Sequence, residues 1–219
     1  GGEWVEVHSG KMGGTSRVPV GFTADNSKVV FRIDDGDEPS RLVLFDPATG
    51  EESLVSRNAN VDADDALVSS DGRELLAIRY LDGLPRYDFV EESHPEALTY
   101  AGLINAFPNR AVSFRGTSDD GRWVLVHAYS DVDPGSYYLF DRQTGTAKFL
   151  LSAMSWIKPD EMSEMRPITF AARDGTPLHG YLTIPRDSDG RDLPLILHPH
   201  GGPHGPRDEW RFNPEVQFL

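Results

Sequence analysis

The sequence contains no cysteine among its 219 residues. A chain without thiols forms no disulfide bond, offers no thiol nucleophile and supplies no thiolate ligand for a metal. Any chemistry it performs must use hydroxyl, carboxyl, imidazole or backbone groups. The absence of cysteine assigns the protein to no particular compartment.

Basic residues are also scarce compared with acidic ones. The sequence has 21 Lys and Arg residues against 35 Asp and Glu residues, which gives a formal net charge of -14 at pH 7. Such a charge repels phosphate backbones, and no block of Lys and Arg interrupts it. We therefore expect no nucleic-acid partner.

Long apolar runs are missing as well. No stretch reaches the roughly 18 apolar residues that a membrane-spanning helix needs. The first residues, GGEWVEVHSG, lack the basic and apolar regions of a signal peptide. We therefore expect no membrane partner. The composition, with 38% hydrophobic and 10% aromatic residues, suffices to bury the core of one large or two small domains.

What is present from residue 3 to residue 151 is a pattern of short β-strands separated by turns. Apolar and aromatic segments alternate with Asp, Gly, Asn and Ser, and helical periodicity is weak. Strands are predicted at residues 28–33, 41–45, 74–80, 123–129 and 136–140. This part of the chain is therefore predicted to be all-β.

One pattern occurs three times within this region. Residues 22–55 and 114–151 share a polar turn, two strands, a D-x-x-T-G turn and a final strand, whereas residues 68–90 lack the D-x-x-T-G turn. A basic residue holds the same place in each copy, at spacings of 45 and 49 residues: Lys28, Arg73 and Arg122. These spacings fit four-stranded propeller blades of about 40 to 50 residues.

We therefore predict a partial β-propeller of about three blades over residues 1–155. A β-sandwich with recurring hairpin turns is the alternative, but the two D-x-x-T-G turns, 95 residues apart, favour blades. Three blades cannot close, and residues 3–7 are typical of the last strand of a preceding blade, so we expect the native N-terminus to lie upstream. A short helix beginning near Pro95 is expected to interrupt the middle blade.

The pattern changes in the last third of the chain, and we predict a second domain over residues 156–219. Residues 166–185 give a hairpin signal with an Asp-Gly turn at its tip. A continuous apolar run follows at 193–197 and is typical of a strand buried on both faces of a mostly parallel sheet. This order predicts the N-terminal strands of an α/β domain.

The segment HPHGGPHGPRDEW, residues 198–210, comes directly after that run. Glycine has no Cβ, so a glycine pair after a strand lets backbone N–H groups approach a ligand and bind an oxyanion. In serine hydrolases of the α/β-hydrolase fold, an HGGG-type loop in this place donates one oxyanion N–H. Because Pro203 has no N–H, the donor must be Gly201, Gly202 or His204, and Gly202 is our first choice.

Two other interpretations of this loop are a plain glycine turn with locally bonded histidines and a metal site made by His198, His200 and His204. No Asp or Glu lies between these histidines, and Pro199 and Pro203 restrict the backbone. We expect neither a metal nor a cofactor.

The hairpin and the loop together resemble a known family. The pattern F-x-x-R-D-G-x-x-L-H-G-Y-L from Phe170 to Leu182, the H-G-G-P loop and the preceding repeats look like the acylaminoacyl-peptidase and dipeptidyl-peptidase branches of the prolyl oligopeptidase family. The resemblance covers the whole chain, weakly in the propeller. It implies a serine peptidase that hydrolyses short peptides by acyl transfer beneath a propeller cap. It also implies that the Gly202 N–H lies in the oxyanion hole, where His200 shapes the loop.

The nucleophile of such an enzyme is missing from the sequence. No serine lies in a G-x-S-x-G elbow, and the family's order of Ser, Asp and His places the whole triad after the oxyanion loop. A helix signal at Asn213, Pro214 and Glu215 stops after about one turn. We therefore expect the catalytic domain to be truncated before its nucleophile, the triad to lie past Leu219, and this chain alone to be inactive.

Two other functions are compatible with these patterns: a non-catalytic propeller module that binds proteins, and a serine esterase of the same fold. For the parent enzyme the expected partner is a short peptide substrate. Open blade edges recruit further strands, so we expect the remainder of the enzyme, a second chain or self-association to cover them.

Overall fold

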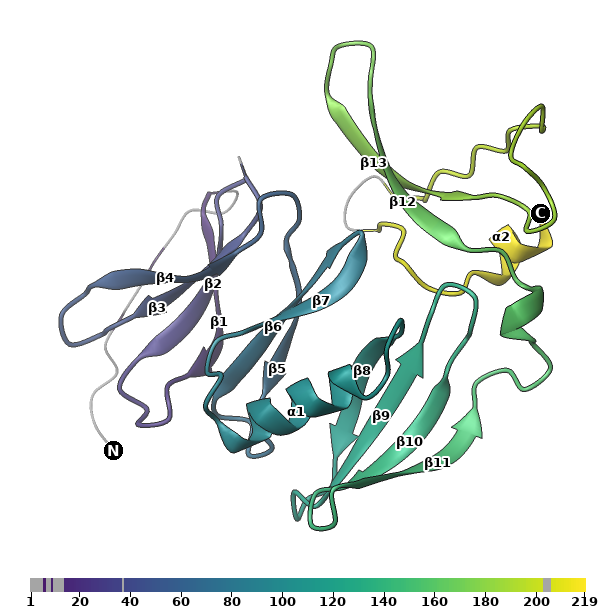
Figure 1. The fold of residues 1–219 in the computed structure, drawn as a ribbon. Coiled ribbons are helices and arrows are strands. Elements are labelled where there is room, and N and C mark those ends of the chain that lie inside the picture. The colour runs from purple at the N-terminus through teal and green to yellow at the C-terminus, as the bar shows by residue number, and fades with distance from the viewer. Residues whose placement is uncertain (1–5, 7–8, 10–13, 37, 203–205) are drawn as a thin grey trace. The chain divides into compact units, whose positions relative to one another are not determined.

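The computed structural model describes residues 6, 9, 14–36, 38–202 and 206–219 (Figure 1). The chain divides into two compact units, Gly1–Gly102 and Leu103–Leu219. Antiparallel β-sheets dominate both units. Their strands form where apolar, β-branched and aromatic residues alternate with polar ones, because such residues fit a pleated, half-buried surface.

The first sheet of the first unit has four strands in sequential order: β1 (Ser16–Phe22), β2 (Val29–Asp34), β3 (Arg41–Phe45) and β4 (Glu52–Arg57). A D-x-x-T-G turn joins β3 to β4. The Asp46 carbonyl accepts a hydrogen bond from Gly50 N at 2.7 Å, and Asp46 Oδ1 accepts one from Ala48 N at 2.9 Å. Gly50 has a φ of 75°, which glycine adopts without a steric cost.

The second sheet of this unit has three strands, followed by a helix: β5 (Ala63–Val68), β6 (Leu75–Asp82), β7 (Leu84–Phe89) and α1 (Pro95–Asn105). The central strand β6 is the most deeply buried, and its residues join one core cluster with residues of β2 and β3: Val30, Leu42, Leu75, Ile78 and Tyr80. The side chains of the two sheets therefore pack against each other. The Tyr80 hydroxyl also shares a 2.9 Å hydrogen bond with Ser56 Oγ of β4.

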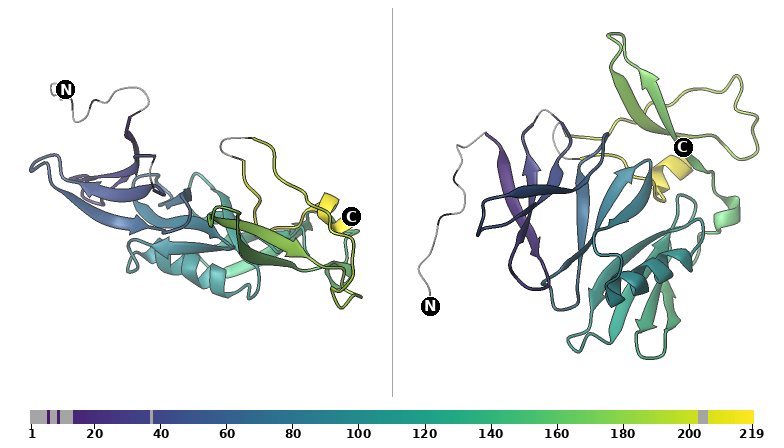
Figure 2. Two further views of the ribbon diagram at one scale, coloured as in Figure 1. Left: turned by 90° about the horizontal axis from the view of Figure 1, so that it is seen from above. Right: turned by 60° about the vertical axis from the view of Figure 1, so that its left-hand side comes forward.

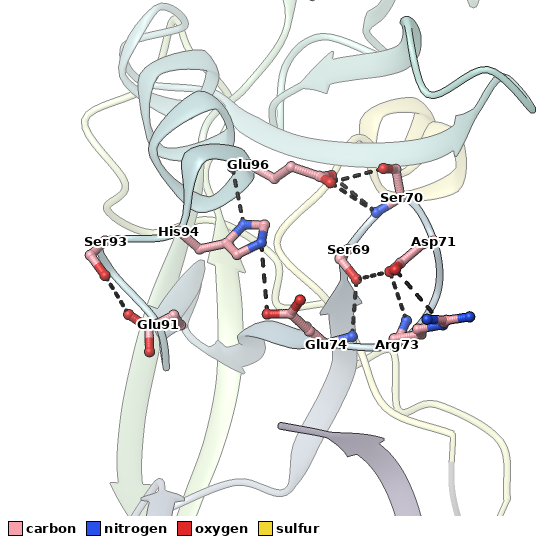
Figure 3. A network of polar contacts seen from close by, with 9 residues as sticks. All are labelled: Ser69, Ser70, Asp71, Arg73, Glu74, Glu91, Ser93, His94 and Glu96. Carbon is pink, nitrogen blue, oxygen red and sulfur yellow. Dashed lines mark hydrogen bonds and ion pairs between the residues drawn. The ribbon is translucent and has the colours of Figure 1, made fainter. Parts of the chain in front are cut away.

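Helix α1 follows β7 where the other copies have a D-x-x-T-G turn and a fourth strand. Figure 3 shows how its first turn is fastened to the turn between β5 and β6. Glu96 accepts hydrogen bonds from Ser70 N at 3.0 Å and from Ser70 Oγ at 2.8 Å. His94 Nδ1 accepts a hydrogen bond from Glu96 N at 3.1 Å, and His94 Nε2 lies 3.7 Å from Glu74 Oε2. These contacts fix the helix to the degenerate copy.

The second unit contains a four-stranded sheet in sequential order, a two-stranded ribbon and two short helices. The sheet is formed by β8 (Ala111–Thr117), β9 (Trp123–Tyr129), β10 (Ser136–Asp141) and β11 (Thr146–Ser152). The later elements are η1 (Pro159–Glu161), β12 (Met165–Ala171), β13 (Pro177–Thr183) and α2 (Pro214–Phe218). β12 and β13 form an antiparallel ribbon of their own (Figure 2).

The recurring basic residue has the same structural role in two of the three copies. Lys28 Nζ lies 3.4 Å from Asp46 Oδ2, and Arg122 binds Asp141 through two hydrogen bonds of 3.0 and 2.7 Å. In both copies the Asp begins the D-x-x-T-G turn and the basic residue stands immediately before β2 or β9, so the pair ties this turn to the start of that strand. The Arg122 guanidinium lowers the pKa of Asp141 to about 2. The degenerate copy has no D-x-x-T-G turn and lacks this pair.

Most predicted elements are confirmed. Two predicted strands match β3 and β9 residue for residue, the other three lie within two residues of β2, β6 and β10, and the helix begins at Pro95. The hairpin also forms, with Gly175 in its turn at a φ of 88°. Closure into a propeller and the domain boundary after residue 155 stay predictions, and the predicted strand at 3–7 lies mostly outside the described residues.

The predicted buried strand at 193–197 does not form in this structure, which corrects the prediction. The run is irregular, and the exposed fractions of Leu195 and Leu197 are 85% and 81%. A parallel strand needs neighbouring strands and a covering layer on each face. No strand within the described ranges pairs with this run, so its apolar character alone does not make it a strand.

Candidate active site

The predicted oxyanion residues lie together in an exposed, irregular segment between β13 and α2. The His200 ring donates a hydrogen bond from Nδ1 to the Gly201 carbonyl at 2.8 Å, because a carbonyl oxygen can only accept. A Cβ added to Gly201 would meet no atom within 4 Å. Gly202 ends the described part of the loop, and Pro203, His204 and Gly205 lie outside the described residues. The roles of Gly202, Gly201 and His200 stay predictions.

The beginning of this segment has one polar contact with α2. His198 Nε2 lies 3.6 Å from Glu215 Oε2, and both side chains are exposed, so the pair contributes little to stability. Helix α2 begins as predicted, with Asn213 as its N-cap and Pro214 in its first turn. Asn213 Oδ1 accepts hydrogen bonds from Glu215 N at 3.0 Å and Val216 N at 3.3 Å.

The end of the segment is held more firmly, because two hydrogen bonds connect it to the rest of the second unit. Trp210 Nε1 donates to the Met165 carbonyl at 3.2 Å, and Phe212 N donates to the Ser130 carbonyl at 2.8 Å. Met165 is the first residue of β12. Burial raises the pKa of the Tyr181 hydroxyl on β13, and the positive charge of Arg207 and a hydrogen bond from the Trp210 backbone oppose the rise.

Ser130 belongs to a short loop between β9 and β10, residues 130–135, which we call the β9–β10 loop. Ser130 Oγ accepts hydrogen bonds from Val132 N at 3.2 Å and Asp133 N at 3.1 Å. Asp133 Oδ1 accepts one from Gly135 N at 2.8 Å, and Asp133 also pairs with Arg110 at 2.8 Å. The loop is therefore braced internally and tied to the start of β8.

The same loop contacts the ribbon. Asp131 is buried, and its Oδ2 accepts a hydrogen bond from Met165 N at 2.6 Å. The loop's last residue, Gly135, accepts a hydrogen bond at its carbonyl from Ala153 N at 2.9 Å. The β9–β10 loop thus connects the sheet, the residues after β11, the ribbon and the segment that follows the candidate oxyanion residues.

Beneath this loop lies the buried ring of His127, stacked between the rings of Tyr129 and Tyr137 at centroid distances of 5.1 and 4.4 Å. Its Nε2 lies 3.1 Å from the Pro134 carbonyl, so this nitrogen carries the proton. Burial lowers the pKa of His127, although the hydrogen bond to Pro134 opposes this. The ring therefore supports the loop through its hydrogen bond to Pro134.

A third connection joins α2 to the residues before β12. Ser163 N donates a 2.9 Å hydrogen bond to Gln217 Oε1, and Gln217 Nε2 donates a 2.8 Å hydrogen bond to the Ser163 carbonyl. This two-way amide contact spans 54 residues of sequence. It fixes α2 next to the linker that precedes the ribbon.

The anchoring residues, above all Ser130, Asp131 and Trp210, were not predicted from the sequence. Their contacts join residues far apart in the sequence, and no local pattern encodes such a pairing. The one available signal was the run S-D-V-D-P-G, residues 130–135, which is unusually dense in residues that hydrogen-bond to nearby backbone groups.

The structure contributes two observations on the alternatives weighed from the sequence. No group of three or more His, Cys, Asp or Glu residues in the described ranges is arranged to hold a metal ion. Of the helices that the structure describes, none has the length and apolar character needed to cross a membrane. One histidine of the alternative metal site, His204, lies outside the described residues.

Known proteins that resemble the chain in structure or in sequence are peptidases. No protein-family model matches the chain. A solved structure from a study of two prolyl endopeptidases matches it with a TM-score of 0.53 and 15% identity, over 83% of this chain and 26% of that one. The antiparallel sheets therefore match the propeller domain of prolyl oligopeptidase-like enzymes.

The sequence comparison leads to a particular peptidase. Dipeptidyl aminopeptidase BIII of Pseudoxanthomonas mexicana is 28% identical over 211 residues, which cover 92% of this chain. The chain spans 30% of the length of that protein. The comparisons confirm the resemblance to peptidases of the prolyl oligopeptidase family, and the match is to a fragment of them.

Proposed function

We propose that this chain is part of a serine peptidase that hydrolyses short peptides by acyl transfer. The observation that carries the proposal is the 28% identity to a dipeptidyl aminopeptidase over 92% of the chain. The chain contributes propeller blades and the loop with His200, Gly201 and Gly202. The α/β-hydrolase domain, to which the ribbon and this loop belong, forms in the whole protein.

In the proposed mechanism, a serine activated by a histidine attacks the peptide carbonyl, and both groups belong to the parent protein. A backbone N–H of the glycine pair, Gly202 as first choice and Gly201 as the second candidate, donates a hydrogen bond to the oxyanion of the tetrahedral intermediate, while His200 shapes the loop. The intermediate collapses as the C–N bond breaks, and the histidine gives the serine's proton to the leaving amine. Water, activated by the same histidine, then attacks the acyl-enzyme, which releases the acid product and regenerates the serine. This chain has no serine in a G-x-S-x-G elbow, so it performs no hydrolysis by itself.

The parent protein also covers apolar surface that is exposed in this chain. The exposed residues lie on β11 and in the run before the loop: Phe149, Leu150, Leu151, Leu195, Ile196 and Leu197. Surfaces of this kind mark interfaces when they are contiguous. We propose that a further blade packs on the β8–β11 sheet and that the rest of the catalytic domain covers residues 193–197.

The proposal predicts the effect of Gly202→Val in the whole protein. A valine side chain displaces the loop and removes its N–H from the oxyanion, and losing one such donor typically costs about 10² to 10³ in turnover. Cleavage of short peptide anilides should fall by about this factor. Circular dichroism and thermal unfolding should change little, because the loop is exposed.

Gly116→Val is the matched control, since a Cβ at Gly116 on β8 meets no atom within 4 Å. This variant should keep the turnover of the parent protein. Unchanged turnover in Gly202→Val would remove Gly202 from the site. Cleavage of esters without cleavage of peptides would contradict the peptidase assignment. Turnover by the 219-residue chain through one of its own serines would contradict the proposal that the catalytic serine lies elsewhere in the parent protein.

A further inference from the structure

We propose that Asp131 is a positioning residue for the candidate oxyanion loop, acting through Met165 and Trp210. The inference rests on the proposed function, because it assigns a role to the contacts that hold the predicted loop. Asp131 itself touches none of the predicted reacting groups.

The chain of contacts begins where Asp131 meets the ribbon. The Asp131 side chain is buried, with 7% of the residue exposed, and its Oδ2 accepts a hydrogen bond from Met165 N at 2.6 Å. Hydrogen bonds to a carboxylate are shorter and stronger than neutral ones. A buried carboxylate at this distance therefore fixes where β12 begins.

The chain of contacts leads on from Met165 to the segment after the loop. The Met165 carbonyl accepts the indole N–H of Trp210 at 3.2 Å, so both backbone polar groups of Met165 take part in one chain of contacts. Trp210 follows Gly202 by eight residues. Two residues further on, Phe212 N donates to the Ser130 carbonyl at 2.8 Å. The segment is thus tied twice to the β9–β10 loop, once directly and once through Met165.

The β9–β10 loop, which holds Asp131, is rigid. The β9–β10 loop is braced by the Ser130 and Asp133 side chains, by the Arg110 ion pair and by the hydrogen bond from His127 to the Pro134 carbonyl. A displacement at Asp131 is therefore not absorbed by its own loop. It passes instead to Met165, Trp210 and the candidate oxyanion loop.

This arrangement matters for the proposed chemistry because an oxyanion donor must be held within a fraction of an ångström. A displacement of about 1 Å from a distant mutation can cost about 10²-fold in rate. Substrate binding depends less on this loop than oxyanion stabilisation does. Loss of Asp131 should therefore lower kcat and leave KM nearly unchanged.

The test uses the whole peptidase and three variants. Asp131→Ala removes the acceptor and should lower kcat about 10- to 100-fold, with KM unchanged. Asp131→Asn keeps an oxygen acceptor of the same shape and should restore most of this loss. The control is Asp120→Ala, which removes an exposed turn aspartate that accepts hydrogen bonds from its neighbours Ser118 and Arg122, and it should leave kcat unchanged.

A further variant keeps the inference testable if Asp131→Ala does not fold. Trp210→Phe removes only the indole donor, so it should reproduce the loss in kcat. Combining it with a folded Asp131→Ala should cost little more than Trp210→Phe alone, because both variants break the same chain of contacts through Met165. An undiminished kcat in Trp210→Phe, or in a folded Asp131→Ala, would overturn the positioning role while leaving the peptidase assignment intact.

A second readout does not depend on activity. Hydrogen exchange at the Trp210 indole N–H, assigned by its loss in Trp210→Phe, should be faster in Asp131→Ala than in the unaltered protein, and nearly normal in Asp131→Asn. If the unaltered protein cleaves no peptide, the proposed function fails, and the exchange rates still decide whether Asp131 holds Trp210. Equal exchange rates in all variants would refute the contact path.

Discussion

Gly135 lies at the end of the β9–β10 loop, where an added methyl group would have no space. Its φ is 99°, a conformation that residues with a Cβ rarely adopt. A Cβ at this position would lie 2.5 Å from His127 Nε2, 2.6 Å from the Ala128 carbonyl oxygen and 2.7 Å from Tyr129 Cβ. The last two atoms belong to or adjoin the backbone of β9, so they cannot rotate away.

The expected cost of Gly135→Ala has two parts. The left-handed backbone conformation costs roughly 1–2 kcal/mol for a residue with a Cβ, and forcing extra atoms into a packed site costs typically about 1–3 kcal/mol more. The free energy of unfolding should therefore fall by about 2–5 kcal/mol. The matched control is Gly145→Ala, where φ is 66° and an added Cβ meets nothing within 4 Å. The free energy of unfolding of this variant should fall only by the backbone part.

Urea unfolding of the two variants and the unaltered chain, followed by fluorescence, measures the difference. Gly135→Ala should shift the midpoint to clearly lower urea than Gly145→Ala at a similar slope. Equal midpoints for the two variants would show that the β9–β10 loop yields to the added methyl group. That result would also weaken the inference about Asp131, which requires this loop to be rigid.

Two further predictions concern pH. Burial lowers the pKa of His127 below its usual value of 6.5. Below about pH 6.5 the unfolded chain therefore binds a proton at this residue more readily than the folded chain does, and the free energy of unfolding should fall as the pH drops. His127→Phe should flatten this fall in urea midpoints, whereas the exposed His179→Phe should not; equal slopes in both would contradict the assignment. The pKa of Asp141 is lowered to about 2 by Arg122, so this pair should stabilise the fold above the usual aspartate pKa of 3.8 and lose its effect between 3.8 and 2. Asp141→Asn should therefore lower the midpoint much more at pH 7 than at pH 2, and a constant difference would refute the pairing.

The local part of the fold could be predicted from the sequence because strands and turns depend on neighbouring residues. Short, nearly continuous apolar runs predicted β3 and β9, and the D-x-x-T-G turns marked the hairpins that end two of the sheets. The missing turn in the middle copy correctly indicated a different structure there. The helix α1 takes the place of the fourth strand and is fastened by Glu96 and His94.

Features that depend on distant partners could not be predicted in this way. The run 193–197 has the composition of a buried strand, yet burial requires neighbouring strands that the described structure does not provide. The contact of Asp131 with Met165 joins residues 34 positions apart, and no periodicity encodes it. For the candidate site, sequence motifs predicted Gly202 as a donor, and this role stays a prediction because the sequence has no G-x-S-x-G motif against which to place it.

The measurement that tests the central claim most directly is peptide cleavage by the whole protein before and after treatment with a fluorophosphonate, which modifies activated serines. The account predicts cleavage of short peptides, one labelled serine outside these 219 residues, and loss of cleavage in proportion to labelling. Cleavage that persists after complete treatment, or a protein that neither cleaves peptides nor reacts, would contradict it.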